Sequence, residues 1–128
     1  MTPDAFKDDW YGELTNQCGH TLIGVVLTAL VVSVWCAVSG EPPYKLVAFG
    51  LVFLPYALIV EWLMQDWLEG DSWFDTAMVA FGSIGVLAPL NWSEDHSALD
   101  FDPVAFIVVV SGWAVLLTFR VLKRFRRG

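Results

Sequence analysis

The sequence predicts an all-α membrane protein: an antiparallel bundle of four transmembrane helices, preceded by a short amphipathic helix on the membrane interface. Of its 128 residues, 56% are hydrophobic and only 16% are charged, which is more apolar surface than so small a domain can bury in water. Four long apolar runs are separated by short polar segments. Five of the seven basic residues lie within residues 120–127, as is typical of a cytoplasmic helix end. We therefore treat residues 1–128 as a single integral membrane domain.

The N-terminal segment predicts the interfacial helix, over residues 3–16. Thr2 and Pro3 are typical of an N-cap and a first helical position. Phe6, Trp10 and Leu14 recur at a spacing of four, with charged residues between them. This pattern places an apolar stripe on one side of a helix that lies along the bilayer surface.

The first transmembrane helix is expected over residues 21–39, because this run carries no charge and is long enough to cross a bilayer. Ala29, Ser33 and Ala37 form a stripe of small residues on one of its sides. Such stripes let two helix backbones approach closely in a membrane. The helix is expected to end at the polar turn that begins with Gly40.

Three further transmembrane helices are expected over about residues 45–65, 72–88 and 104–122. Pro55 lies within the first of these and predicts a local break in its hydrogen bonding, because proline lacks an amide hydrogen. The last begins after Asp102 and Pro103, again a cap followed by proline. Short connections between successive helices favour antiparallel neighbours.

The basic residues at the end of the fourth helix predict that the C-terminus is cytoplasmic, and an even number of spans then places the N-terminus on the same side. The expected partner is the lipid bilayer, with a homo-oligomer or a membrane complex as a further expectation. The net charge of −7 argues against a nucleic-acid partner.

Polar residues at the ends of three predicted helices form the candidate site. Because the helices alternate in direction, these residues converge on one side of the membrane: His20, Glu61, Gln65, Asp71 and Asp75. Within this set, His20, Glu61 and Asp75 have the chemistry to bind a divalent metal, to handle a proton or to hold a polar lipid headgroup. A purely structural role is the alternative, in which Asp75 caps its helix and Glu61 pairs with His20. No cofactor is identifiable, and catalytic residues are unknown.

The order of these motifs resembles the VanZ-like family of small bacterial membrane proteins. In that family a His opens one helix, an E-x-x-Q closes the next, and an acidic pair leads into a helix with N-x-x-G. Residues that stand in comparable places here are His20, Glu61, Asp71, Asp75 and Gly82, within a resemblance that covers about residues 20–90. Gln65 follows Glu61 by four positions rather than three, and Val79 stands where the family has Asn. The resemblance implies a protein of the bacterial inner membrane that acts in the cell envelope, without assigning a chemistry.

Three functions remain open from the sequence. The first is a VanZ-like envelope protein with a polar site at the cytoplasmic face. The second is a structural or assembly protein, such as a small complex subunit or a phage holin-like oligomer. The third is a small carrier. An enzyme is not favoured, because the sequence contains no nucleophile motif, phosphate-binding loop or HExxH helix.

Overall fold

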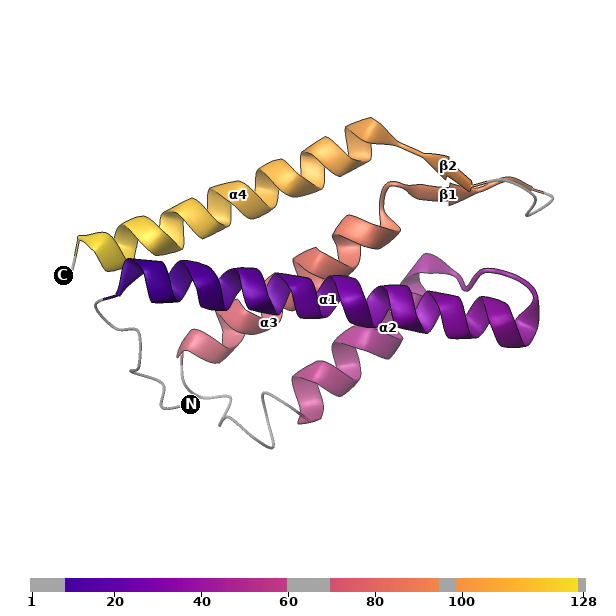
Figure 1. The fold of residues 1–128 in the computed structure, drawn as a ribbon, viewed down its shortest axis with the longest axis horizontal. Helices are drawn as coiled ribbons and strands as arrows, with labels where there is room; N and C mark the ends of the chain where they lie inside the picture. The colour runs from indigo at the N-terminus through magenta and orange to yellow at the C-terminus, as the bar shows by residue number, and fades with distance from the viewer. Residues whose placement is uncertain (1–8, 60–69, 95–98, 127–128) are drawn as a thin grey trace.

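The computed structural model describes residues 9–59, 70–94 and 99–126, and these form helices joined by short connections and one small β-hairpin (Figure 1). The elements in chain order are α1 (Trp10–Ser39), α2 (Lys45–Pro55), α3 (Gly70–Leu87), β1 (Leu90–Trp92), β2 (Leu99–Phe101) and α4 (Pro103–Phe125). The predicted helical character is thus confirmed apart from the hairpin, in which β1 and β2 pair antiparallel between the third and fourth expected helices.

Helix α1 is continuous over 30 residues, which differs from the expected separation into an interfacial helix and a span. Asp9 caps it, and its carboxylate accepts a hydrogen bond of 3.0 Å from the Tyr11 amide. Gly40 ends it with a positive φ of 77°, and its amide donates to the Cys36 carbonyl at 2.9 Å. The expected start at Thr2 and Pro3 lies outside the described residues.

Helix α2 changes its winding at the proline, as the sequence predicts. It is α-helical up to Pro55 and continues as a π-helical turn over residues 56–59. Proline has no amide hydrogen to donate to the preceding turn, so a wider turn at this point disturbs the helix least. The remainder of the expected span, residues 60–65, lies outside the described residues.

The start of α4 follows the predicted cap. One carboxylate oxygen of Asp102 accepts hydrogen bonds from the amides of Val104 at 2.9 Å and Ala105 at 3.1 Å. Pro103 occupies the first helical position, where a missing amide hydrogen removes no helical hydrogen bond. The helix then continues to Phe125, three residues beyond its expected end.

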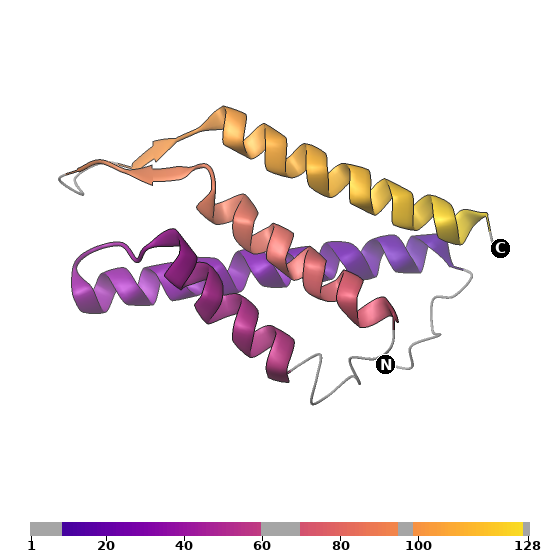
Figure 2. The ribbon, with the colours of Figure 1, turned by 180° about the vertical axis from the view of Figure 1, so that it is seen from behind.

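Successive helices alternate in direction, and α3 lies between α2 and α4 when seen from either side (Figures 1 and 2). Both α1 and α3 contact each of the other three helices. The N-terminal ends of α1 and α3 and the C-terminal end of α4 lie toward the same end of the molecule (Figure 1). Side chains from distant parts of the sequence can therefore meet at this end.

Helices α1 and α3 cross at two glycines. A Cβ atom added to Gly24 would lie 2.0 Å from the Val79 carbonyl oxygen, and one added to Gly82 would lie 2.0 Å from the Thr21 carbonyl oxygen. Only glycine permits so close an approach of two helix backbones. The small-residue stripe expected to do this, Ala29, Ser33 and Ala37, is instead exposed.

The apolar surface of the molecule faces outward. Two helices are long and apolar enough to cross a membrane, namely α1 and residues 103–123 of α4. In their most apolar 18-residue stretches only 11% and 6% of residues are buried, whereas the core helix of a water-soluble protein is mostly buried. At 1.5 Å per residue α1 is about 45 Å long, so it exceeds a ~30 Å hydrocarbon core. In length, composition and exposure these two helices are those expected of membrane-spanning helices.

Candidate functional site

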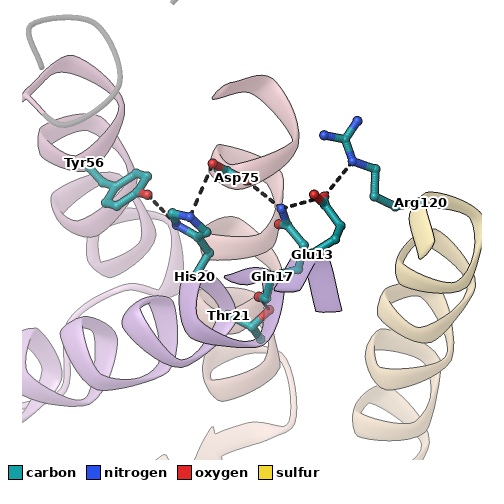
Figure 3. A network of polar contacts seen from close by, with 7 residues as sticks. All are labelled: Glu13, Gln17, His20, Thr21, Tyr56, Asp75 and Arg120. Atoms are coloured by element: carbon teal, nitrogen blue, oxygen red, sulfur yellow. Dashed lines mark hydrogen bonds and ion pairs between the residues drawn. The ribbon is translucent and has the colours of Figure 1, made fainter. Parts of the chain in front are cut away.

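A chain of polar side chains crosses the bundle at the end where α1 and α3 begin (Figure 3). Its centre is His20 on α1. The ring nitrogen Nδ1 lies 2.8 Å from the Tyr56 hydroxyl of the π-helical turn, and Nε2 lies 3.3 Å from the Asp75 carboxylate of α3. One imidazole thus joins a phenol and a carboxylate from two other helices.

Gln17, one turn before His20, links two carboxylates. Its amide nitrogen donates to Asp75 at 2.7 Å and to Glu13 at 3.1 Å. An NH₂ group has two hydrogens, so it satisfies both acceptors at once. Gln17 therefore holds the carboxylates of Glu13 and Asp75 near each other.

Arg120 extends the chain to α4. Its Nε donates to Glu13 at 2.8 Å, and the two side chains are 13% and 4% exposed. The guanidinium carbon also lies 5.0 Å from the centre of the Phe74 ring on α3, within the range of a cation–π contact. A buried pair with additional hydrogen bonds is the arrangement in which an ion pair withstands removal from water.

Thr21 makes a second connection to α4. Its hydroxyl accepts a hydrogen bond of 2.9 Å from the indole nitrogen of Trp113 and donates to the Gln17 carbonyl at 3.0 Å. The backbone carbonyl of Thr21 forms the Gly82 contact, so the same turn of α1 packs against α3 and bonds to α4.

Local sequence explains how these residues come together. On α1, the positions of Glu13, Gln17 and Thr21 follow each other at intervals of one helical turn and therefore share a side. The glycine crossing holds this side against α3. Tyr56 is the first residue of the π-helical turn after Pro55, and π turns of this kind are frequent at functional sites.

The structure brings together two of the five residues that the sequence singled out, His20 and Asp75. Asp75 lies within α3 and its carboxylate oxygens bond to α1, so it does not act as the helix cap that the structural alternative assumed. Asp71 is part of α3, but its side chain lies outside the described part of the structure. Glu61 and Gln65 lie outside the described residues altogether.

Sequence reasoning missed four members of this network. From the sequence, Glu13 is placed in the interfacial helix, Arg120 among the topology residues and Tyr56 in an apolar span, and no role is assigned to Gln17. The spacing of Glu13, Gln17 and His20 on one side of a helix was the available signal. Because the sequence was divided into two helices near residue 20, the polar side of a single continuous helix was not recognised.

A divalent metal site built from His20, Glu61 and Asp75 stays a prediction. Within the described residues, no group of three His, Cys, Asp or Glu side chains could hold a metal ion. Two buried side-chain oxygen atoms lack a hydrogen-bond partner: Oε1 of Gln17, and Oγ1 of Thr76, the residue after Asp75.

Comparisons with known proteins add no relative: no family model, curated protein or solved structure matches this chain. The VanZ-like resemblance therefore remains an expectation from the sequence.

Proposed function

We propose that this chain is a four-span protein of the bacterial inner membrane, VanZ-like, with both termini in the cytoplasm and a functional polar site at the cytoplasmic face. The observation that carries the proposal is the buried polar chain from Tyr56 through His20, Asp75, Gln17 and Glu13 to Arg120, which joins all four helices at one end. Charged and polar groups buried between apolar helices are costly, and their presence there favours a function.

The depth of the network supports a role at the membrane surface. Glu13, Gln17 and His20 lie within the first 11 positions of α1, roughly 15 Å of helix, and α1 is longer than the hydrocarbon core by a similar amount. This geometry favours placing them near the headgroups rather than at the bilayer centre. The basic residues that begin with Arg120 lie at the same end, which supports the cytoplasmic assignment.

The chemistry of the His20 contacts supports a site that handles a proton or a polar ligand. An imidazole between a phenol and a carboxylate can take a proton at one nitrogen and release one from the other. Tyr56 is 5% exposed and Asp75 is 7% exposed, so any such exchange is sheltered from lipid. A polar contact whose only role is to join helices needs hydrogen bonds but no titratable group at its centre.

An assembly protein is the second candidate. The stripe formed by Ala29, Ser33 and Ala37 is exposed on α1 and is not used within the molecule. Such a stripe suits close contact with another transmembrane helix. A homo-oligomer or a small subunit of a membrane complex would use this side of α1.

Cysteine accessibility tests the topology. In a variant without Cys18 and Cys36, single cysteines are introduced by Glu41→Cys, Asp66→Cys or Lys123→Cys and treated with a membrane-impermeant maleimide on intact cells. We expect labelling only of Glu41→Cys, because four spans place the other two positions inside. Labelling of Asp66→Cys on intact cells would contradict four spans, since it requires that the segment between α2 and α3 faces outward.

Native mass spectrometry in mild detergent separates the two candidate functions. For a functional polar site we expect a monomer that carries a bound lipid or metal, and loss of that adduct in Asp75→Asn while the far-ultraviolet circular dichroism stays helical. The assembly alternative predicts a homo-oligomer whose mass distribution is the same in wild type and Asp75→Asn. A bare monomer in both proteins would contradict the site.

A further inference from the structure

The β-hairpin between α3 and α4 has one polar face and one apolar face. Side chains alternate between the two faces along a strand, and residues paired across antiparallel strands share a face. In the observed register the pair formed by Asn91 and Asp100 therefore lies on one face. The opposite face carries only apolar and aromatic side chains: Leu90, Trp92, Leu99 and Phe101. The hairpin is thus amphipathic.

The polar face is turned toward the helices, and the apolar face is turned away from them. Asn91 accepts a hydrogen bond of 2.9 Å from Nζ of Lys45 at the start of α2. The apolar face is largely uncovered, with exposed fractions of 40%, 50% and 56% for Trp92, Leu99 and Phe101. An antiparallel sheet in a water-soluble protein does the reverse and packs its apolar face on the core. Because an isolated two-stranded hairpin is at best marginally stable, this face needs a surface outside the chain to pack against.

The apolar face of the hairpin continues the exposed apolar surface of α4. The ring of Phe101 lies 5.5 Å from that of Phe106, measured between centroids. Phe106 is 41% exposed, and Val104 and Ile107 beside it are 68% and 61% exposed. These residues belong to the stretch of α4 that is long and apolar enough to cross a membrane. In the proposed four-span arrangement this surface faces lipid, so the same lipid covers the hairpin.

The position of the hairpin fixes its level relative to the bilayer. The apolar stretch of α4 has 21 residues, or about 32 Å of helix, which matches a ~30 Å hydrocarbon core. The hairpin lies beyond the start of this helix, at the end of the molecule opposite the polar network (Figures 1 and 2). It therefore lies at the headgroup level. Tryptophan is enriched there, and water at this level can bond to open strand edges, which hydrocarbon cannot do.

We propose that the apolar face of the β1–β2 hairpin inserts into the boundary between headgroups and acyl chains of the outer leaflet, as an interfacial anchor. Asp100, on the opposite face, stays hydrated. The amide of Asp102 donates to the Pro89 carbonyl at 2.7 Å and closes the base of the hairpin, so the anchor also fixes the depth of α3 and α4. This inference rests on the proposed four-span topology and adds a lipid-binding element to it.

The test uses three consecutive positions of β2 in the full chain. In the variant without Cys18 and Cys36, single cysteines are introduced by Leu99→Cys, Asp100→Cys or Phe101→Cys and labelled with the environment-sensitive fluorophore NBD. Each protein is placed in nanodiscs of phosphatidylcholine and phosphatidylglycerol. Quenching is then measured with aqueous iodide and, separately, with a lipid that carries a nitroxide near the top of its acyl chain.

We expect the quenching to alternate along the strand. The labels at residues 99 and 101 should be quenched severalfold more by the nitroxide lipid, and severalfold less by iodide, than the label at residue 100. Val108→Cys is the lipid reference, because Val108 is 64% exposed on α4. Glu41→Cys, at an exposed residue of the turn after α1, is the water reference.

Equal access of iodide to all three labels would overturn the proposal, because the apolar face would then lie in water. Labels at residues 99 and 101 that neither quencher reaches would also overturn it, since a second copy or another protein would then cover this face. Equal nitroxide quenching at all three positions would contradict the orientation. If the label at Val108 escapes the nitroxide as well, the proposed membrane arrangement itself fails. Quenching at Val108 without quenching in the hairpin rejects the anchor alone.

Discussion

The two parts of α1 have opposite surroundings. Residues 10–28 pack against the other helices, and their buried members are all glycine or polar: Gly12, Glu13, Gln17, Gly24 and Thr28. Residues 29–39 are far more apolar, yet none of them is buried. A water-soluble helix would bury its apolar part instead. This arrangement is the one expected of a helix in lipid, where burying an apolar side chain against another helix gains little and a polar group needs a partner.

Among changes that test this comparison, removal of the Glu13–Arg120 ion pair should have the largest effect on the free energy of unfolding. Glu13→Ala leaves Arg120 without its buried carboxylate partner, and loss of one member of a buried pair costs about 3 kcal/mol of unfolding free energy. This loss is measured by titrating the protein with SDS and monitoring unfolding through tryptophan fluorescence. Glu41→Ala, at an exposed glutamate beyond the other end of α1, is the control and should change little.

A double-variant cycle then isolates the pair. If Glu13 and Arg120 interact as described, Glu13→Ala combined with Arg120→Ala should destabilise less than the sum of the single changes. Strict additivity would contradict the interaction.

A substitution at the glycine contact between α1 and α3 should have an effect of intermediate size on stability. Gly24→Ala places a methyl group against the Val79 carbonyl, so α1 and α3 must move apart, at a cost of about 2 kcal/mol. Gly19→Ala is the matched control in the same helix, because nothing lies within 4 Å of its added Cβ. This control should be neutral or stabilise by roughly 0.5 kcal/mol through better helix propensity. Similar effects of the two changes would show that the close approach is unimportant.

The smallest expected effect on stability comes from removing one hydroxyl group in each part of α1. Thr28→Val removes the hydrogen bond to Ser83, and single bonds between transmembrane helices contribute about 0.6 kcal/mol. Ser33→Val, in the exposed part, removes a hydroxyl that faces outward and should not destabilise the protein in detergent. If Ser33→Val costs as much as Thr28→Val, then residues 29–39 are in contact with another protein surface, as the assembly alternative requires.

Much of the fold follows from local rules. The Asp102–Pro103 start of α4, the glycine end of α1 and the disturbance after Pro55 were each predicted, because capping, positive φ and a missing amide hydrogen act within a few residues. Alternating helix directions placed His20 and Asp75 at one end. The hairpin was not predicted, since strands of three residues leave too short a pattern to recognise.

The sequence by itself predicted the apolar helical segments, which end carries the basic residues and that His20 and Asp75 would converge there. The tertiary structure alone decided that Glu13 and Gln17 turn inward, that Arg120 pairs with Glu13, and that Gly24 and Gly82 rather than the small-residue stripe form the crossing. The physical reason is that hydrophobicity identifies the long apolar helices but does not distinguish their sides. The inward side of each helix is set by packing and hydrogen bonds between helices distant in sequence.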